Sequence, residues 1–329
     1  MIRALLIALI LGAAPLRADP VLSIAGTFAA DRDYGTVLAA LDDAQADATS
    51  VTLFWDEMEV NGTYAPPFDW PAISNFVYPG RGLQVSLMIA VVDTVADRRP
   101  ADLRGLAYDD PVVLARFATF LTEVLSRMPA VDLVSIGVGN EVDGVLQGED
   151  WAQYAAFFAA ARDLAHRARQ GVPVGMTLTW AGLTGPSAAR ARALADLGDV
   201  WMVNYYPLLA GFQIDDPADL PGQLNAMLQA AHGAQVYLTE VGYPSDGCGA
   251  TETGQLAFTQ TILAYADAHA DRIPLVNLVW LHDLSPAEVD QAVGYYGVGG
   301  NCFAAFVASL GLRSHDGADK PAFAWLRQR

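Results

Sequence analysis

Two glutamates stand out because each closes a short apolar run. Glu141 ends Val134-Ser-Ile-Gly-Val-Gly-Asn-Glu, and Glu240 ends Val236-Tyr-Leu-Thr-Glu. Two carboxyl groups that face each other suit acid–base work on a glycosidic bond. One, protonated, donates to the leaving oxygen, while the other attacks the anomeric carbon or activates water. The acid needs a raised pKa, which burial and the charge of its partner can supply. The sequence therefore predicts a catalytic pair, provided that the fold brings the two together.

The elements that would position this pair repeat one pattern. A short β-branched run is followed by a loop and an amphipathic stretch, as at 111–127, 151–169 and 253–270. Alternation of strands and helices predicts a parallel sheet with crossover helices. Eight repeats in about 310 residues favour an α/β fold, a (β/α)8 TIM barrel in a single domain. The predicted strands are 21–28, 50–55, 83–91, 132–139, 172–180, 199–206, 235–241 and 274–281.

The rival architecture is an open doubly wound sheet. It would carry a Gly-rich phosphate loop after its first strand, and Thr27-Phe-Ala-Ala-Asp31 is no such loop. In a barrel, catalytic groups lie at the carboxyl ends of the strands. Glu141 and Glu240 would then follow the fourth and seventh strands, on opposed sides of the barrel mouth.

Alternation along the fourth strand predicts the direction of Glu141. Bulky residues occupy one face and small residues the other, and the small face suits the crowded barrel interior. Glu141 falls on the small face, so we expect it to point toward the barrel axis. The small face comprises Ser135, Gly137, Gly139 and Glu141.

The first eighteen residues have the order of a secretory signal peptide. A basic start (Met1-Ile-Arg3) precedes an apolar run, 4–14, and Ala18 supplies a small residue at a plausible cleavage point. We expect residues 1–18 to be removed, a mature catalytic domain at 19–329, a secreted or periplasmic location and no membrane association after cleavage. The net charge of −18 disfavours nucleic acid partners. We also expect a monomer.

The chain has two cysteines, Cys248 and Cys302. An exported protein meets an oxidising compartment, so a disulfide between them is the expected state. It would join the loops after the seventh and eighth strands. Two cysteines without histidines at ligand spacing cannot build a zinc site, and we expect neither a metal nor a cofactor.

The two glutamate motifs resemble clan A glycoside hydrolases. The resemblance rests on Gly139-Asn140-Glu141, Thr239-Glu240-Val-Gly-Tyr-Pro-Ser, Asn204-Tyr-Tyr-Pro207, Trp280 and Asp316-Gly-Ala-Asp-Lys-Pro-Ala322. It implies a retaining mechanism with Glu141 as acid/base and Glu240 as nucleophile. Val-Gly-Asn-Glu-Val is most similar to family 17, the β-1,3-glucanases, and Asn-Glu-Val-Asp-Gly also to family 53, the β-1,4-galactanases. Many clan members carry an arginine at the end of the second strand; this chain has Phe54-Trp-Asp-Glu-Met-Glu59 there.

Further residues near predicted strand ends suit sugar recognition, because aromatic rings stack on sugars and polar groups bind hydroxyls. We expect Tyr205 or Tyr206 to hydrogen-bond the nucleophile. The acidic group Asp56, Glu57 and Glu59 leaves three readings open: solvated loop charge, hydroxyl recognition or a cation site. The predicted substrate-binding residues are Asn140, Tyr205, Tyr206, Trp280, Trp55, Trp180, Tyr243, Glu57 and His282.

The leading hypothesis is a retaining β-glycosidase that acts on a polysaccharide or oligosaccharide, endo-acting on β-1,3-glucan. A β-1,4-galactanase and a glucan transglycosylase are alternatives with the same residues. A carbohydrate-binding barrel without catalysis is the alternative from a different class. The sequence contains no Gly-x-Ser-x-Gly elbow, no phosphate-binding loop and no His-Glu-x-x-His motif.

Overall fold

A computed structural model describes residues 19–329 of the chain. The predicted signal peptide, 1–18, lies outside the described residues. Within 19–329 no helix combines the length and the apolar composition needed to cross a membrane.

The parallel strands form a closed barrel. Their order is β8, β7, β5, β2, β1, β12, β11, β10, β9. The end strands β8 (Val174–Gly175) and β9 (Thr177–Thr179) are pieces of one predicted strand, separated only by Met176, so the sheet closes on itself. The eight predicted strands are thus confirmed. The others are β1 (Val21–Ile24), β2 (Ala48–Phe54), β5 (Gln84–Asp93), β7 (Leu133–Asn140), β10 (Trp201–Tyr205), β11 (Val236–Val241) and β12 (Leu275–Leu278).

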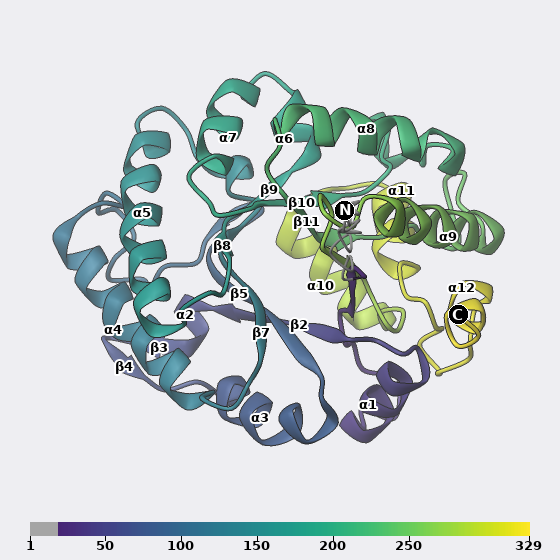
Figure 1. Ribbon diagram of the computed structural model, residues 1–329, viewed down its shortest axis with the longest axis horizontal. Helices are drawn as coiled ribbons and strands as arrows, with labels where there is room; N and C mark the ends of the chain where they lie inside the picture. Colours follow the sequence, from purple (N-terminus) through teal and green to yellow (C-terminus); the bar gives the residue numbers. More distant parts are fainter. Residues whose placement is uncertain (1–18) are drawn as a thin grey trace, which may run out of the picture.

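Helices surround the barrel in a ring (Figure 1). Their starts are encoded locally: Asp110 caps α4 by accepting from the backbone of Val112, and Pro111 opens the helix. The helices that follow the strands include α1 (Tyr34–Asp43), α2 (Trp55–Met58), α3 (Trp70–Val77), α4 (Pro111–Arg127), α5 (Asp150–Ala168), α6 (Trp180–Thr184), α7 (Ala188–Ala195), α8 (Leu220–Ala230), α9 (Glu252–Ala268) and α12 (Pro321–Leu326).

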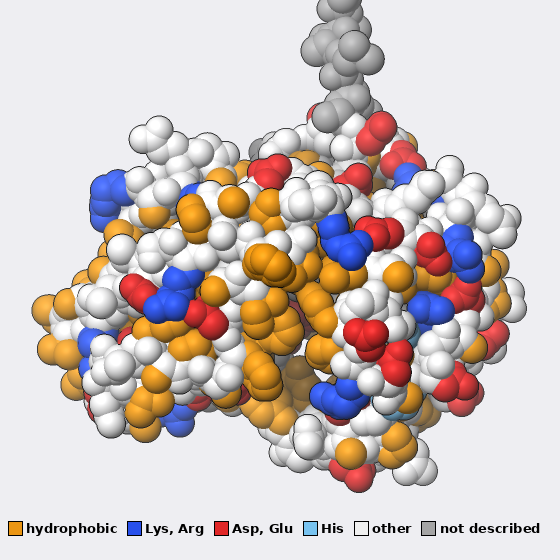
Figure 2. Space-filling model, turned by 90° about the horizontal axis from the view of Figure 1, so that it is seen from below, with side chains coloured by type: hydrophobic (Ala, Val, Ile, Leu, Met, Phe, Trp, Pro, Cys, Tyr) orange, Lys and Arg blue, Asp and Glu red, His pale blue; other side chains and the backbone are white. Residues whose placement is uncertain are grey.

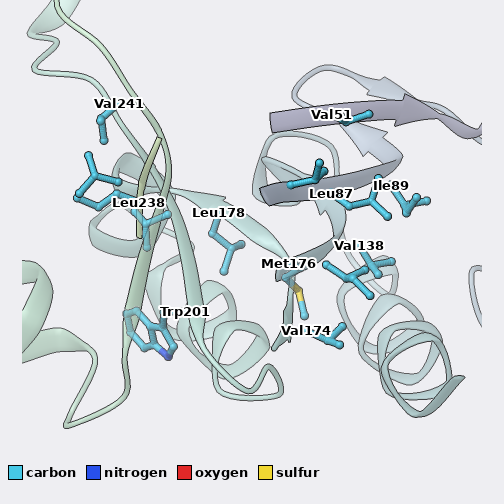
Figure 3. Close-up of a cluster of buried hydrophobic side chains, with 14 of the residues drawn as sticks. Val51, Leu87, Ile89, Val138, Val174, Met176, Leu178, Trp201, Leu238 and Val241 are labelled. Atoms are coloured by element: carbon cyan, nitrogen blue, oxygen red, sulfur yellow. The ribbon is translucent and has the colours of Figure 1, made fainter. Parts of the chain in front are cut away.

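Apolar side chains from neighbouring strands pack in register to form the core. Val51 pairs with Leu87, and Ile89 pairs with Val138; Figure 3 shows these side chains gathered on their strands. All four are nearly or fully excluded from solvent. This core fixes the strand ends, and therefore the site, with little freedom.

The connection after β12 is long and carries two extra helices, α10 (Pro286–Tyr296) and α11 (Asn301–Ala308). In Figure 1 α10 lies inside the ring of outer helices, over one end of the barrel. Cys302 of α11 is joined to Cys248 in the loop after β11, with 5.5 Å between the Cα atoms. The structure thus contains the predicted disulfide, which ties the two loops together.

Candidate active site

Glu141 follows β7 directly, but the strand does not alternate as predicted. A Cβ atom on Gly137 would meet Met88 and Met202 from neighbouring strands, inside the barrel. At Gly139, whose φ is 88°, a Cβ would instead meet Tyr154 of the outer helix α5. The placement of Gly139 on the inner face was therefore wrong. Glu141 itself has a left-handed backbone (φ 48°), and its side chain meets Asn204. The predicted inward direction of Glu141 is therefore right, but it results from this backbone conformation and not from alternation along the strand.

Glu240 lies in β11 on the other side of the mouth. Its Oε2 accepts a 2.8 Å hydrogen bond from the hydroxyl of Tyr206, which follows β10. Of the two tyrosines that were open in the sequence, Tyr206 is therefore the one that contacts this carboxylate. Tyr205 is buried among apolar neighbours.

One amide lies against both glutamates. Asn204 Nδ2 donates to Glu141 Oε1 at 3.0 Å, and its amide also helps to lower the pKa of Glu240. Each carboxyl is thus held by a side chain at the end of β10 or just beyond it, Glu141 by Asn204 and Glu240 by Tyr206. In retaining enzymes the two carboxyl groups lie about 5–5.5 Å apart.

Burial makes both glutamates harder to ionise. It raises the pKa of Glu141, and the charges of Asp143 and Asp93 raise it further. Burial and the charge of Glu141 raise the pKa of Glu240 to about 8, against the lowering effect of the bonds from Tyr206 and Asn204. Since each charge disfavours the other, the pair holds a proton near neutral pH.

Two residues of the site were missed at the sequence level. Asp93 ends β5; its Oδ1 accepts from Asn140 Nδ2 at 2.9 Å and its Oδ2 from the Tyr295 hydroxyl at 2.6 Å. Asn140 Oδ1 in turn accepts from Asn204 at 3.2 Å. Asp93 obeys the same strand-end rule as Glu141, which could have found it. Tyr295 lies 202 residues away on α10, and no local pattern indicates that contact.

Besides Tyr205, three more predicted sugar contacts lie in the core. Trp55 is fully buried, with its ring 5.2 Å from that of Phe117. Tyr243 is 4% exposed and packs on Phe258. His282 is fully buried and its Nδ1 lies 2.7 Å from the carbonyl of Thr27. None of the three presents a surface to a sugar ring, so these predictions do not fit the structure.

Two predicted tryptophans remain partly accessible. Trp180 opens α6, and its indole N–H donates to Gln223 at 3.1 Å. Trp280 follows β12 and packs against the apolar cluster that contains Phe303 and Phe306 of α11.

Arginines neutralise the acidic residues after β2. Arg98 pairs with Asp56 at 2.9 Å and with Glu57 at 2.6 Å, and Arg104 also pairs with Asp56. Glu59 is buried against Trp55 and Arg116. Three interpretations of this acidic group were open, and burial rules out the first of them, solvated loop charge, for Glu59. Within 19–329 no group of three or more His, Cys, Asp or Glu residues is arranged to hold a metal ion.

Many clan A enzymes carry an arginine at the end of the second strand. In this chain Phe54 ends β2 instead. Arg98 covers that ring with its guanidinium 4.2 Å from the centroid. Arg98 reaches this place from the chain beyond β5, so a cation lies near the end of β2 although its sequence position is different.

A series of aromatic rings lies beside the barrel mouth, on the side of α1 and α3. Phe28, Tyr34, Trp70 and Phe68 follow one another with centroid separations of 5.8, 5.9 and 6.5 Å. Phe68 is 66% exposed and the other three are partly exposed. Figure 2 views this side of the molecule and shows hydrophobic side chains gathered around a hollow. This surface was not predicted from the sequence.

Comparison with solved structures finds the same fold in glycoside hydrolases. A variant of GH5_18 from Streptomyces cattleya in complex with Manb1-4GlcNAc is 19% identical, with a TM-score of 0.70 over 94% of this chain and 80% of that one. GH5_18 from Bifidobacterium longum subsp. longum is 18% identical, with a TM-score of 0.71 over 94% and 78%.

A third similar structure is the exo-beta-1,4-mannosidase Op5Man5 from Opitutaceae bacterium strain TAV5. It is 14% identical, with a TM-score of 0.69 over 94% of this chain and 58% of that one. No protein-family model and no curated protein matches the chain. At these identities the likeness establishes the fold, a (β/α)8 barrel like that of the glycoside hydrolases named above. It gives no support to the finer assignment to family 17 or 53.

Proposed function

We propose that the protein is a retaining β-glycosidase with Glu141 as acid/base and Glu240 as nucleophile. The observation that carries the proposal is the pair itself: two partly exposed carboxyls at opposed strand ends, Glu141 bonded to Asn204 and Glu240 to Tyr206, with burial and the charge of Glu141 raising the pKa of Glu240. The glycoside hydrolases that share the fold add support.

The chemistry follows from the two environments. Glu240 Oε2, held by Tyr206, attacks the anomeric carbon while Glu141 gives its proton to the leaving oxygen, so one glycosidic bond breaks and a glycosyl ester forms. Glu141, now ionised, then takes a proton from water as the water attacks the same carbon. The ester breaks, Glu240 is released as a carboxylate, and the sugar keeps its anomeric configuration.

The substrate is proposed at two levels. The sequence resemblance favours endo action on β-1,3-glucan, with β-1,4-galactan as the alternative. The ligand of one similar structure, Manb1-4GlcNAc, adds β-1,4-mannosides to the candidates. The exposed aromatic series Phe28, Tyr34, Trp70 and Phe68 offers apolar ring faces, which suit the faces of neutral sugars.

The test is release of reducing sugar from laminarin, β-1,4-galactan and β-1,4-mannan by the wild type, E240A and E141A. We expect activity on at least one substrate in the wild type and a loss of about 10⁴-fold or more in E240A. Azide should restore turnover of an activated aryl glycoside in E240A with inverted product. Binding without turnover by the wild type would indicate the non-catalytic barrel, and products longer than the substrate a transglycosylase.

A further inference from the structure

A directional chain of hydrogen bonds runs through the site from α10 to the acid/base. Tyr295 donates to Asp93, which accepts from Asn140; Asn140 accepts from Asn204, and Asn204 donates to Glu141. The three middle members are 7%, 8% and 2% exposed, so little water competes for their polar atoms. Every link is between 2.6 and 3.2 Å long.

We propose that Asp93 is a positioning residue that fixes the orientation of both amides and, through them, the carboxyl of Glu141. The proposal rests on the proposed function, because it assigns Asp93 to the setting of the acid/base. Neither the sequence motifs nor the resemblance assigned it a role.

The direction of the chain follows from the donors and acceptors available. A carboxylate can only accept, so Asp93 compels Asn140 to present its NH2 group, which leaves the Asn140 oxygen facing Asn204. Asn204 must then turn its NH2 group toward Asn140, and the same group reaches Glu141. The Thr239 hydroxyl closes the arrangement by donating to Asn204 Oδ1 at 2.9 Å.

An asparagine at position 93 would remove this constraint. Its NH2 group could face Asn140, whose amide would then turn over and point its own NH2 group at Asn204. Asn204 could answer only by turning as well, which would set its oxygen against the carboxylate of Glu141 and repel it. D93N keeps the size of the side chain, so it tests the orientation and the charge at this position rather than the packing.

The Tyr295 bond extends this control to the loop after β12. It occupies Oδ2 of Asp93, and a second contact joins the same hydroxyl to the Asp93 carbonyl at 3.1 Å. Through Tyr295, α10 holds the carboxylate in the rotamer that meets Asn140. Y295F should therefore act in the same direction as D93N, but more weakly.

Leaving groups separate positioning of the acid from general damage. We would measure kcat/KM for phenyl and 2,4-dinitrophenyl β-glucosides, β-mannosides and β-galactosides. A dinitrophenolate leaves without protonation, whereas phenolate needs the proton of Glu141. D93N should lower kcat/KM for the phenyl glycoside about 100-fold more than for the dinitrophenyl one. D290N, at an exposed carboxylate of α10, is the matched control.

Equal losses on both leaving groups would overturn the proposal, because they would indicate damage that does not act through the acid. Crystal structures of the wild type and D93N give a second readout that needs no activity. We expect the bond of 3.0 Å between Asn204 and Glu141 to be present in the wild type and broken in D93N. An unchanged bond would also overturn it. If the wild type cleaves no glycoside, the proposed function fails while these structures still decide the role of Asp93.

Discussion

Tyr206 donates a 2.8 Å hydrogen bond to Glu240 from the end of the neighbouring strand. This bond opposes the effects of burial and of Glu141, which together raise the pKa of Glu240 to about 8. The hydroxyl therefore favours the ionised form that a nucleophile requires. It is also a donor aimed at charge in a place with little water, where such donors have their largest effect.

We expect Y206F to lower kcat/KM by about 10²-fold. The pKa of Glu240 should rise, because the bond that lowers it is gone, so a smaller share of the enzyme has the ionised nucleophile at neutral pH. Y205F is the matched control: it removes a hydroxyl from the adjacent residue, which makes no hydrogen bond to either glutamate. Equal losses in the two variants would contradict a specific role for Tyr206.

The proton held by the pair sets the alkaline limit of activity. Turnover needs one glutamate ionised and the other protonated. Because burial and mutual repulsion raise the pKa of Glu240 to about 8, the pair loses its last proton as the pH rises past that value. We expect kcat/KM to fall above about pH 8, measured from pH 4 to 10 on the best substrate. Constant activity from pH 7 to 10 would refute this.

The same shift predicts that the site costs stability. Glu240 has a pKa near 4.5 when unfolded and about 8 when folded. Between these values the folded state keeps a proton that the unfolded chain releases, so stability falls as the pH rises. E240Q cannot lose a proton. Its melting temperature should match that of the wild type near pH 4 and exceed it increasingly up to pH 8, by a free energy of unfolding on the order of 1–2 kcal/mol.

Unfolding followed by circular dichroism at pH 4, 6 and 8 would measure this difference. E57Q is a suitable control because that side chain is 56% exposed and paired at the surface. If the difference in the free energy of unfolding between E240Q and the wild type narrowed with rising pH, ionisation of Glu240 would not destabilise the folded state.

The barrel could be predicted because each strand is locally encoded by a buried apolar run between turn residues. Strand ends were less certain. The predicted strand 21–28 ends at Ile24. Beyond it, a side-chain contact takes the place of regular strand pairing: the Thr27 hydroxyl both donates to and accepts from the backbone of His282. The split of 172–180 at Met176 likewise reflects pairing with two different neighbours, β7 and β10.

The site was only partly predictable. Position at a strand end found Glu141 and Glu240, but the same criterion selected Trp55 and His282, whose side chains pack into the core. A prediction from strand alternation assumes that every residue is extended. Gly139 has a left-handed backbone instead, so the predicted assignment of inner and outer faces fails there. The contact between Asp93 and Tyr295 depends on how α10 lies over the barrel, which no neighbouring residue encodes.

The aromatic series on the α1 and α3 side should contribute to binding of long substrates. W70A removes a central ring that contacts both Tyr34 and Phe68. We expect KM for the polysaccharide substrate to rise about tenfold with little change in kcat, and no change for a small aryl glycoside. F76A is the control, because Phe76 is 88% exposed on the same helix. An equal effect on the aryl glycoside would argue against binding at this surface.

A buried lysine holds the loops behind the nucleophile. The Lys320 ammonium donates to Asp283 at 2.7 Å, to the Ser245 hydroxyl at 2.7 Å and to the carbonyl of Gly311 at 2.8 Å. The Lys320 side chain is 7% exposed and that of Asp283 16%. Removing the lysine leaves a half-satisfied carboxylate away from water, so K320M should lower the free energy of unfolding by about 3–5 kcal/mol.

The double variant K320M/D283N separates the lost attraction from the stranded charge. If the stranded Asp283 carboxylate causes most of the loss, the double variant should be more stable than K320M at pH 7, as measured by urea denaturation. Because burial raises the pKa of Asp283 and the Lys320 bond lowers it, K320M should also recover part of its deficit as the pH falls and Asp283 takes up a proton. A deficit that is independent of pH, with no recovery in the double variant, would assign the loss to packing of the lysine side chain alone.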